Sequence, residues 1–377
     1  MKTPKPQTLL AILLAIAILI ILYLLLHPAP GLRITTLRPL DIPGSAPSAT
    51  PAPLPADATL RIATYNIENF TDARRDGPLR TPALAAAQAA GAASVIAEAD
   101  PDILLLQEIE NPAALALLNA ALPAPYPYAY ITRYRASDLS AVRINEALLS
   151  RIPPSEVRQI SFNRLPDGRR PTRGALSVRV PLAAGRDLLL YAIHLKSNYG
   201  IPPRNVAQRT IALHLLAADA AAERYRTSDH AALSVLMLGD TNVDPDTPEF
   251  ASDPSLDALA GGYSDLWRGR PIDERTTLPT RHAGPDGDTN LVFRPAAFDR
   301  VFASRDLVTP PPYPDPALDP LLPPAPAYSV TPPRAIQRGC ATNDNTLLPG
   351  QPPHISDHYL VYLDLLPSPT DGAPEKN

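Results

Sequence analysis

The stretch Val235–Pro245, VLMLGDTNVDP, joins an apolar strand to a group of polar residues. Its apolar residues are typical of a buried strand, and Gly239, Asp240 and Asn242 follow where that strand ends. Asp and Asn are common in turns because their side chains bond to the nearby backbone. Asp240 and Asn242 therefore fit a turn as well as they fit an active site. The residues at the ends of the other strands distinguish the two.

Polar side chains flank apolar stretches at five further places in the chain. These are Asn66 with Glu68, Glu108, His194 with Lys196 and Asn198, Asp299, and Asp357 with His358. Each one alone also fits a cap, a turn or an ordinary half-buried histidine. In layered α/β folds, however, ligand sites gather where strand ends converge. The recurrence of the pattern in six separate elements predicts one shared site.

The residue types in this set indicate a particular chemistry. Carboxylates and amides without a cysteine cluster suit a hard cation such as Mg²⁺ or Mn²⁺. Two histidines beside carboxylates can supply acid–base catalysis near neutral pH, and a metal with cationic donors stabilises the charge that develops on a phosphate. The chain contains neither a G-x-S-x-G elbow nor an H-E-x-x-H motif. Phosphoester hydrolysis by an activated water is therefore the predicted reaction.

The globular part is expected to span residues 58–366, where strand patterns outnumber helical ones. Helices are predicted over residues 82–96, with Thr81 as the cap, and over 111–122 and 203–226. The strands come in groups between single helices, and several are apolar on both faces. This pattern predicts an α/β fold of two packed sheets with helices outside.

The first 27 residues are predicted to form a membrane anchor. Leu9–Leu26 is an unbroken apolar run, about long enough for a bilayer core. Lys2 and Lys5 precede it, which places the short amino terminus in the cytoplasm and the bulk of the chain at the periplasmic or extracellular face. A cleaved signal peptide, leading to secretion, is the alternative, although its apolar core is normally shorter.

Proline-rich segments flank and interrupt the globular part. Residues 28–57 predict a semi-extended linker without a packable pattern. Residues 309–353 predict one long excursion within the domain, with an inert surface loop as the favoured interpretation, and residues 367–377 a disordered tail. The excursion contains Cys340, the chain's single cysteine, so an internal disulfide is excluded.

The composition limits the partners. The 377 residues carry a net charge of −4, which is not the global basic excess of a tight, non-specific nucleic-acid binder. A local basic rim can still serve a nuclease. The candidates for such a rim are Arg133, Arg135, Arg143, Lys196 and Arg204. No protein partner can be inferred, and a monomer is expected.

The order of six motifs resembles the endonuclease/exonuclease/phosphatase superfamily. The motifs are TYNIEN, LLLQEIEN, AIHLKSN, MLGDTNVD, FDRVF and SDHYLV, and they lie between about Leu60 and Leu366. The resemblance implies a DNase-like, four-layer α/β/β/α sandwich with the site at one end of the paired sheets. It also implies hydrolysis of a phosphodiester with Mg²⁺ or Mn²⁺.

The resemblance implies four residues on the metal side of the site. Glu108 looks like the principal metal ligand, and Asn66 looks like the amide that orients it or touches the phosphate. Glu68 stands where some members have an additional acid, and Asp357 resembles the acid that can contact the metal.

Five residues match the catalytic positions of the superfamily. Asp240 looks like the group that positions or deprotonates the attacking water, and Asn242 looks like a phosphate contact. His358 resembles the histidine that polarises a phosphate oxygen, with Asp299 as the carboxylate that fixes its ring. His194 stands where DNase-type members have a histidine that can act on the leaving oxygen.

Two substrate classes fit this site. Arg173 resembles a basic residue that touches the phosphate, and Lys196 and Asn198 are the other predicted substrate contacts. A DNase-like nuclease is favoured, because the sequence after Asp240 lacks the aromatic and basic pattern of inositol phosphatases. A lipid or small-molecule phosphodiesterase or phosphatase is the alternative, with the aromatic stretch from Tyr126 as a candidate membrane-facing hairpin. A catalytically inactive binding relative is the third hypothesis, and the intact set of acids, amides and histidines argues against it.

Overall fold

The computed structural model describes most of the globular part of the chain. The described residues are 31–46, 50–74, 76, 79–134, 144–162, 173–226, 233–282, 291–308 and 328–367. The predicted anchor over Leu9–Leu26 and the predicted tail from residue 368 onwards lie outside them. Within the described ranges, no helix is both long enough and apolar enough to cross a membrane.

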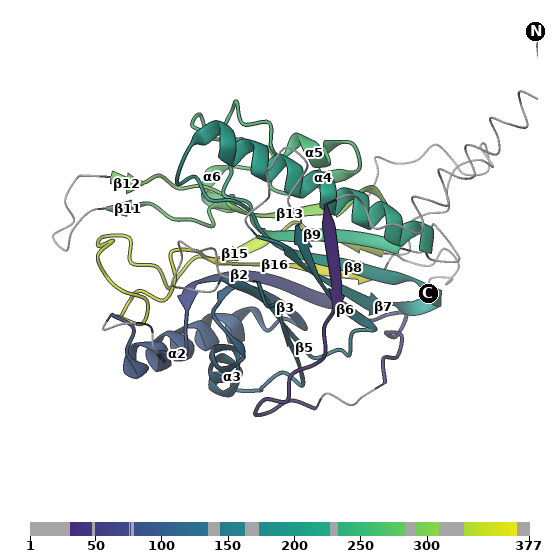
Figure 1. Cartoon of the computed structure of the whole chain (residues 1–377), viewed down its shortest axis with the longest axis horizontal. Coiled ribbons are helices and arrows are strands. Elements are labelled where there is room, and N and C mark those ends of the chain that lie inside the picture. Colours follow the sequence, from purple (N-terminus) through teal and green to yellow (C-terminus); the bar gives the residue numbers. More distant parts are fainter. Residues whose placement is uncertain are drawn as a thin grey trace, which may run out of the picture.

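Two seven-stranded sheets form the centre of the molecule (Figure 1). The first has the order β1-β6-β7-β8-β9-β13-β10. Its strands are β1 (Leu32–Thr36), β6 (Glu156–Phe162), β7 (Ala175–Pro181), β8 (Asp187–His194), β9 (Leu233–Asp240), β13 (Asp299–Ser304) and β10 (Tyr263–Asp265). The central pair β8 and β9 is parallel, and the other pairs are antiparallel.

The second sheet has the order β14-β16-β2-β3-β5-β4, with β15 also paired to β16. Its strands are β14 (Tyr328–Val330), β16 (Leu360–Pro367), β2 (Leu60–Phe70), β3 (Ile103–Ile109), β5 (Asn145–Ser150), β4 (Tyr128–Ile131) and β15 (Arg334–Ile336). Here too the central pair, β2 and β3, is parallel. A small separate ladder joins β11 (Arg281–His282) to β12 (Leu291–Phe293).

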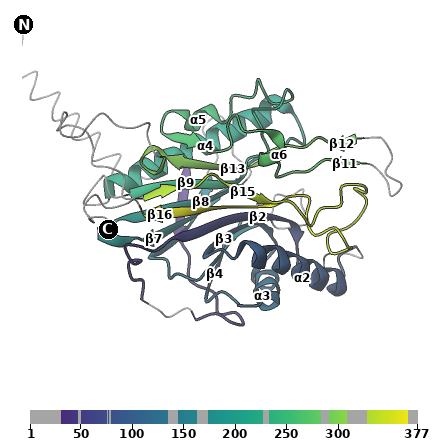
Figure 2. The ribbon, with the colours of Figure 1, turned by 180° about the vertical axis from the view of Figure 1, so that it is seen from behind.

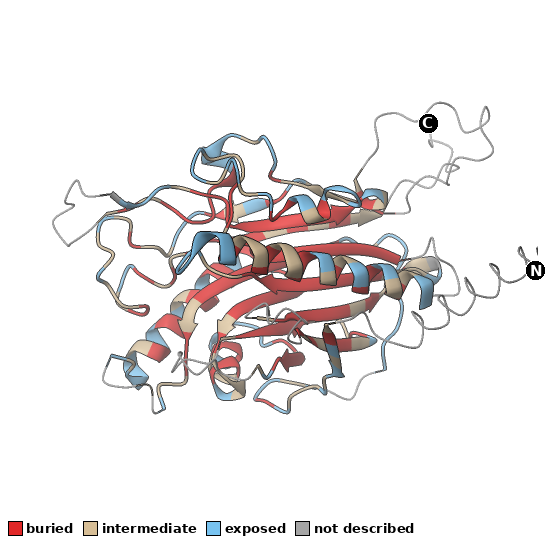
Figure 3. Cartoon of the chain, turned by 45° about the horizontal axis from the view of Figure 1, so that its top comes forward, coloured by how far each residue is buried: buried red, intermediate tan, exposed pale blue. Residues whose placement is uncertain are grey.

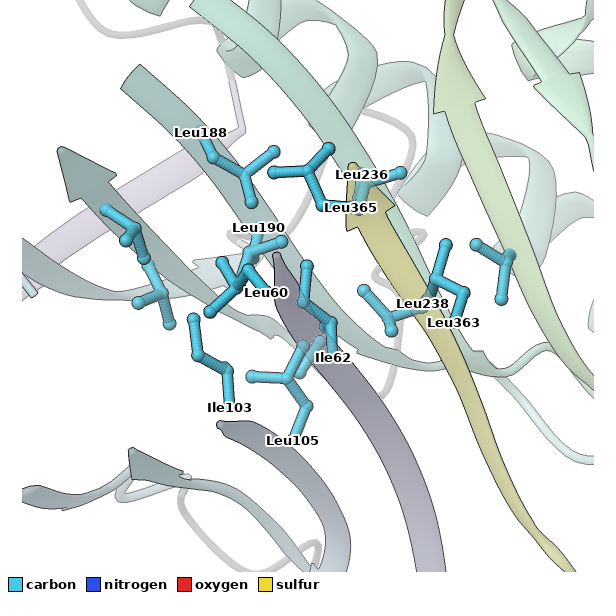
Figure 4. Packing of buried hydrophobic residues seen from close by; sticks show 14 of the residues in the cluster. Leu60, Ile62, Ile103, Leu105, Leu188, Leu190, Leu236, Leu238, Leu363 and Leu365 are labelled. Atoms are coloured by element: carbon cyan, nitrogen blue, oxygen red, sulfur yellow. The ribbon is translucent and has the colours of Figure 1, made fainter. Parts of the chain in front are cut away.

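The core between the sheets is built from alternate residues of facing strands. Leu60 and Ile62 of β2 belong to the same buried cluster as Leu236 and Leu238 of β9. Leucine and isoleucine side chains from both sheets interdigitate in this layer (Figure 4). Successive side chains of a strand point to opposite faces, so the intervening residues face the helices. This explains why β3 and β9 are apolar at nearly every position.

Helices cover the two outer faces, which confirms the predicted sandwich of two sheets. They are α2 (Pro82–Ala99), α3 (Pro112–Ala121), α4 (Pro202–Arg226) and the short α5 (Asp257–Ala260) and α6 (Ile272–Arg275), with 3₁₀ turns at Ala183–Gly185 and Arg305–Leu307. Figures 1 and 2 show α4 and α5 on one side of the sheets and α2 and α3 on the other. The layers therefore run α/β/β/α. Figure 3 shows the resulting pattern, with buried strands inside and exposed faces on the helices.

The predicted cap at Thr81 is confirmed, and a second cap at Asn111 was not predicted. The Thr81 hydroxyl accepts a hydrogen bond from the Leu84 N–H at 3.3 Å, and the Asn111 side chain accepts from the N–H groups of Ala113 and Ala114. An N-cap side chain satisfies helix N–H groups that have no partner within the helix. Because Asn111 caps α3, Glu108 is free for the site.

Two proline-rich segments are more ordered than the sequence predicts. Within the expected linker, Leu32–Thr36 forms β1 and pairs antiparallel with β6, and Ile42 is buried against the α2 and α3 layer. The segment LRITT lacks proline and carries β-branched residues, which suits it to an open sheet edge. Within the expected excursion, β14 and β15 both pair with β16. The expectation of a loop is therefore wrong for β14 and β15, whereas residues 309–327 lie outside the described part.

Candidate active site

The strand registers bring the predicted site residues to one end of the sandwich. In the first sheet Asp240 is opposite His194 of β8 and Asp299 of β13. In the second sheet Asn66 of β2 is opposite Gln107 of β3, one residue before Glu108. The two sheets meet at this end, where the Asn66 Nδ2 group donates to Asp240 Oδ2 at 3.2 Å.

The stretch that follows β9 is both a turn and a binding loop. Gly239 has φ +137°, and a Cβ there would lie 2.1 Å from the carbonyl oxygen of Ile193, so only glycine fits. Asn242 has φ +55°, and its N–H donates to Asp240 Oδ1 at 2.8 Å. Asn tolerates this left-handed conformation better than most residues. The backbone therefore turns directly after Asp240, and the turn itself bonds to the Asp240 carboxylate.

Asp244 fixes the same loop two residues later. It is fully buried, and its carboxylate accepts from the Ala297 N–H at 2.9 Å. It also forms ion pairs with Arg275 and with Arg300, the latter at 3.3 Å. A buried carboxylate with this number of partners holds a single conformation. The loop that carries Asp240 and Asn242 is therefore anchored at both ends.

Asp240 lies at the centre of the site. It is 2% exposed, and its Oδ2 accepts from Asn66 Nδ2 at 3.2 Å and from Asn242 Nδ2 at 3.0 Å. His194 Nε2 lies 3.3 Å from the same oxygen, and His358 Nε2 lies 3.9 Å from it. Donors from both sheets thus surround one carboxylate.

Burial, helped by the neighbouring Asp299, raises the pKa of Asp240 to about 6 against the opposing effects of His358 and the Asn242 N–H. A carboxylate whose pKa approaches neutrality accepts a proton more readily than a solvated one. The environment of Asp240 therefore suits a proton acceptor.

His358 is paired with Asp299 in the first sheet. The Nδ1 of His358 lies 2.6 Å from Asp299 Oδ2, and both residues are buried. Burial alone would lower the pKa of His358, but the carboxylates of Asp299, Asp240 and Asp357 raise it well above its usual value. These carboxylates therefore favour the cationic form of the imidazole, and Asp299 fixes its ring as a partner carboxylate does.

His194 has the opposite electrostatic character. Burial lowers its pKa well below the usual value, and the charges of Arg173 and His358 lower it further. Its Nδ1 is buried without a hydrogen-bond partner among the described residues. The site therefore holds one neutral and one cationic histidine on either side of Asp240.

The acidic side chains on the second sheet form a set that fits a hard cation. The Glu108 carboxylate accepts from the Asn69 N–H at 2.8 Å and from Asn66 Nδ2 at 3.4 Å. Glu108 itself has φ +64°, a conformation that turns its side chain out of the strand pattern. Burial raises the pKa of Asp357 to about 7, with the nearby Glu68 and Glu108 raising it too. Crowded carboxylates of this kind favour a divalent cation among them.

Asn66 supplies one more indication of a missing partner. Its Oδ1 atom is buried and has no hydrogen-bond donor among the described residues. An amide oxygen in such a position is a suitable ligand for Mg²⁺ or Mn²⁺ or an acceptor for a bound substrate. The predicted cation therefore fits the residues on this side of the site.

Comparison with sequence models identifies the family of the chain. A sequence model described as the endonuclease/exonuclease/phosphatase family matches residues 63–358. The chain belongs to this family. A search among curated proteins found no match to the chain.

Solved structures of the same fold give the comparison in three dimensions. TDP2 from Caenorhabditis elegans is 15% identical, with 82% of this chain and 74% of that chain covered and a TM-score of 0.51. An endonuclease/exonuclease/phosphatase from Beutenbergia cavernae is 19% identical, with 82% and 72% covered and a TM-score of 0.49. D. rerio TDP2 complexed with a single-strand DNA product is 20% identical, with 82% and 99% covered and a TM-score of 0.47. At 15% identity, the likeness to the Caenorhabditis elegans structure shows the shared fold alone.

A second acidic cluster in this family member was not predicted. Asp72, Asp76 and Glu110 each bring a carboxylate oxygen within 4.8 Å of the others, and among the described residues no other such group of three acids, histidines or cysteines is as close. Glu110 lies two residues beyond Glu108, so the cluster flanks the same strand end. The three side chains are half-buried and could hold a divalent cation.

The predicted substrate contacts are placed around the site, but all three of them donate to backbone carbonyls. Arg173 donates from Nη1 to the Leu195 carbonyl at 2.8 Å. Lys196 Nζ donates to the Ser197 and Tyr199 carbonyls, and Asn198 Nδ2 donates to the Asn242 carbonyl at 2.8 Å. Lys196 and Asn198 therefore brace the loop after β8, and their direct contact with a substrate stays a prediction.

Sequence reasoning missed several polar residues that border the site. Glu146 at the start of β5 is buried, the Tyr134 hydroxyl donates to it, and burial raises its pKa to about 8. Arg281 lies 3.9 Å from Asp357, and His354 lies 2.8 Å from Glu68. The sequence carries no local signal for Glu146, whose place depends on the pairing of β5 with β3. Because β5 is antiparallel to β3, its first residues lie at the edge where β3 ends.

Proposed function

We propose that the chain is a divalent-metal-dependent phosphodiester hydrolase that acts on nucleic acid. The observation that carries the proposal is the environment of Asp240. A buried carboxylate with a raised pKa lies between a neutral and a cationic histidine, and it faces acids that suit a hard cation. Membership of the family supports phosphoester hydrolysis at a general level.

In the proposed reaction, Asp240 accepts the proton of the attacking water. Asn66 and Asn242 hold its carboxylate in place through Nδ2–Oδ2 hydrogen bonds of 3.2 and 3.0 Å. The cationic His358 stabilises negative charge on a phosphate oxygen. His194, which is neutral, donates a hydrogen bond from Nε2 to the leaving oxygen, and that oxygen takes its proton from solvent.

The metal site of the proposal consists of Glu108, Asp357, Glu68 and the Asn66 amide oxygen. When bound, Mg²⁺ or Mn²⁺ supplies positive charge that stabilises the developing charge on the phosphate oxygens. The Asn69 N–H and Asn66 Nδ2 orient the Glu108 carboxylate by hydrogen bonds. This set adjoins the acid–base residues, because Asn66 Nδ2 also donates to Asp240 and Glu108 Oε1 lies 3.6 Å from His194 Nε2.

The loop between β8 and α4 supports a nucleic-acid substrate. Tyr199 is 90% exposed on this loop, although its carbonyl accepts from Lys196 Nζ at 2.7 Å and from Asn205 Nδ2 at 3.3 Å. Arg209 Nη1 donates to Asn198 Oδ1 at 3.1 Å in the same loop. An aromatic ring that is exposed on a braced backbone beside a phosphate site suits stacking against a base.

The aromatic stretch from Tyr126, a candidate membrane-facing hairpin of a lipid enzyme, is buried at its three leading tyrosines. Tyr126, Tyr128 and Tyr130 are 1%, 7% and 7% exposed, so their rings are not available to a bilayer. Ile201, beside Tyr199, is 64% exposed. A lipid phosphodiester therefore stays the second candidate substrate. In that case the exposed Tyr199 and Ile201 are the side chains that contact the lipid surface.

We also propose that Leu9–Leu26 anchors the chain with the catalytic domain outside the cytoplasm. The support is the apolar run and the two lysines before it. Signal cleavage is the alternative, and the amino-terminal sequence of the mature protein separates the two.

A substrate panel with a matched variant tests the substrate class. Purified chain is assayed in Mg²⁺ on single-stranded DNA, RNA, plasmid DNA, sphingomyelin and phosphoinositide vesicles. We expect hydrolysis of single-stranded nucleic acid, weakened by added salt because backbone phosphate contacts are screened. Tyr199→Ala is expected to raise KM for a single-stranded oligonucleotide about 5- to 150-fold, since stacking contributes about 1–3 kcal/mol per base.

The same variant should leave hydrolysis of bis(p-nitrophenyl) phosphate, which lacks a nucleobase, close to wild type. Tyr225→Ala, in an exposed position of α4, is the matched control. Hydrolysis of vesicle lipids but not of nucleic acid would assign the second candidate instead. An unchanged oligonucleotide KM in Tyr199→Ala would remove the stacking role.

A further inference from the structure

The segment between β15 and β16 is pressed onto α2 next to the active site. Arg338 donates from Nε to Glu98 Oε2 at 2.6 Å and from Nη2 to the Ser94 carbonyl at 2.8 Å. Gly350 has φ +92°, and a Cβ there would lie 2.2 Å from the Leu84 carbonyl oxygen. Figures 1 and 2 both show this yellow segment beside α2. The second half of the proline-rich excursion is therefore a packed part of the domain.

His354 lies near the end of this segment, six residues before β16, and is fully buried. Its backbone is fixed on both sides, since its N–H donates to the Gln351 carbonyl at 2.7 Å and its carbonyl accepts from the Gly350 N–H at 2.9 Å. Its Nδ1 accepts a hydrogen bond from the Ala341 N–H at 3.3 Å. A backbone N–H can only donate, so Nδ1 carries no proton and the ring proton is on Nε2.

The protonated nitrogen of His354 faces Glu68. His354 Nε2 lies 2.8 Å from Glu68 Oε2, in an off-axis contact rather than a linear hydrogen bond. The Gln88 side chain ties the two backbones together, because its Nε2 donates to the carbonyls of Ile67, Glu68 and Ile355 at 3.0–3.2 Å. The end of β2 and the start of the final motif are thus held in one arrangement.

We propose that His354 is a positioning residue that orients the Glu68 carboxylate for the divalent cation. Glu68 engages His354 through Oε2, which leaves Oε1 as the ligand atom. Neutral donors that orient a ligating carboxylate act this way in metal sites, and their loss lowers metal affinity by about 10- to 100-fold. The inference rests on the proposed function, and it gives the excursion a role that its sequence pattern does not indicate.

The test is Mn²⁺ binding, measured by calorimetry on the full-length chain without substrate. The variants are His354→Gln, Glu68→Gln and the double variant, with Glu108→Gln as the reference for the site. His214→Gln, in an exposed position of α4, is the matched control. Only binding that Glu108→Gln removes is assigned to this site, which separates it from the cluster of Asp72, Asp76 and Glu110.

We expect His354→Gln to weaken Mn²⁺ binding about 10- to 100-fold. Glu68→Gln should weaken it at least as much, and the double variant should be no weaker than Glu68→Gln alone. Such non-additivity shows that His354 acts through Glu68. Circular dichroism and the thermal midpoint of each variant establish that it is folded.

Three results decide against parts of the account. Wild-type affinity in a folded His354→Gln chain overturns the inference, and so does full additivity in the double variant, which indicates a purely structural histidine. If His354→Gln does not fold, Glu68→Gln alone decides, because unchanged Mn²⁺ affinity in that variant overturns the inference. Unchanged affinity in Glu108→Gln instead overturns the metal site of the proposed function.

Discussion

Asp240→Asn is expected to lower the rate constant of phosphodiester hydrolysis by about 10³-fold or more, the upper part of the range for removing a catalytic base. The amide has the same shape as the carboxylate but cannot accept the proton of the attacking water. With the amide oxygen in the Oδ2 position, Asn66 Nδ2 and Asn242 Nδ2 can still donate to it, and only the Asn242 N–H loses its acceptor. We therefore expect the fold to be kept. Steady-state kinetics on a single-stranded oligonucleotide measures the effect.

The control for this prediction is a carboxylate of similar chemistry away from the site. Asp273→Asn, exposed on α6, should have wild-type kinetics. The thermal midpoint of Asp240→Asn should stay near that of the wild type, because the substitution removes a charge whose burial is unfavourable. Normal turnover by a folded Asp240→Asn chain would sink the proposed mechanism.

His358→Ala is expected to reduce the rate constant by about 10²- to 10⁴-fold. The imidazole places a positive charge 3.9 Å from the Asp240 carboxylate. Its Nδ1 is held by Asp299 Oδ2 at 2.6 Å. Its loss removes the stabilisation of negative charge on the phosphate and leaves the Asp299 carboxylate buried without its partner. The expected change is mainly in kcat, since the interaction strengthens as charge develops.

A double-variant cycle shows whether the pair acts as a unit. Asp299→Asn keeps an oxygen near His358 Nδ1 and should cost less than His358→Ala. In the His358→Ala background, Asp299→Asn should add little further loss, because its partner is already gone. His214→Ala is the surface control. A His358→Ala chain with near-wild-type kcat, or independent effects of the two substitutions, would contradict this assignment.

The site residues that could be predicted from the sequence are mainly those at the ends of strands. Asp240, His194 and Asp299 could be predicted because each adjoins an apolar strand that is buried on both faces, and such strands can only lie in the middle of a layered sheet. The question raised by the stretch after Val235 is resolved in favour of both answers. The residues do form a turn, with Asn242 in a left-handed conformation, and that turn binds the carboxylate at the centre of the site.

The residues that were not predicted owe their positions to contacts between segments far apart in the sequence. His354 comes from a segment without periodicity, and its position depends on how that segment packs on α2, which no local pattern records. Glu146 begins an antiparallel strand, so its place in the site depends on the pairing of β5 with β3. Leu32–Thr36 is a short edge strand within a proline-rich region, where composition outweighs the alternation of a few residues. In each case the deciding information is a long-range contact.

Metal dependence is the most direct test of the central claim that this site hydrolyses phosphodiesters with a divalent cation. Hydrolysis of a single-stranded oligonucleotide is measured for the wild type and Glu108→Gln, first in EDTA and then across a Mg²⁺ titration. The account predicts no hydrolysis in EDTA, full recovery of the wild type with Mg²⁺, and a Glu108→Gln chain that is inactive or needs far more Mg²⁺. Equal wild-type rates in EDTA and in Mg²⁺, or a Glu108→Gln titration that overlays the wild type, would contradict it.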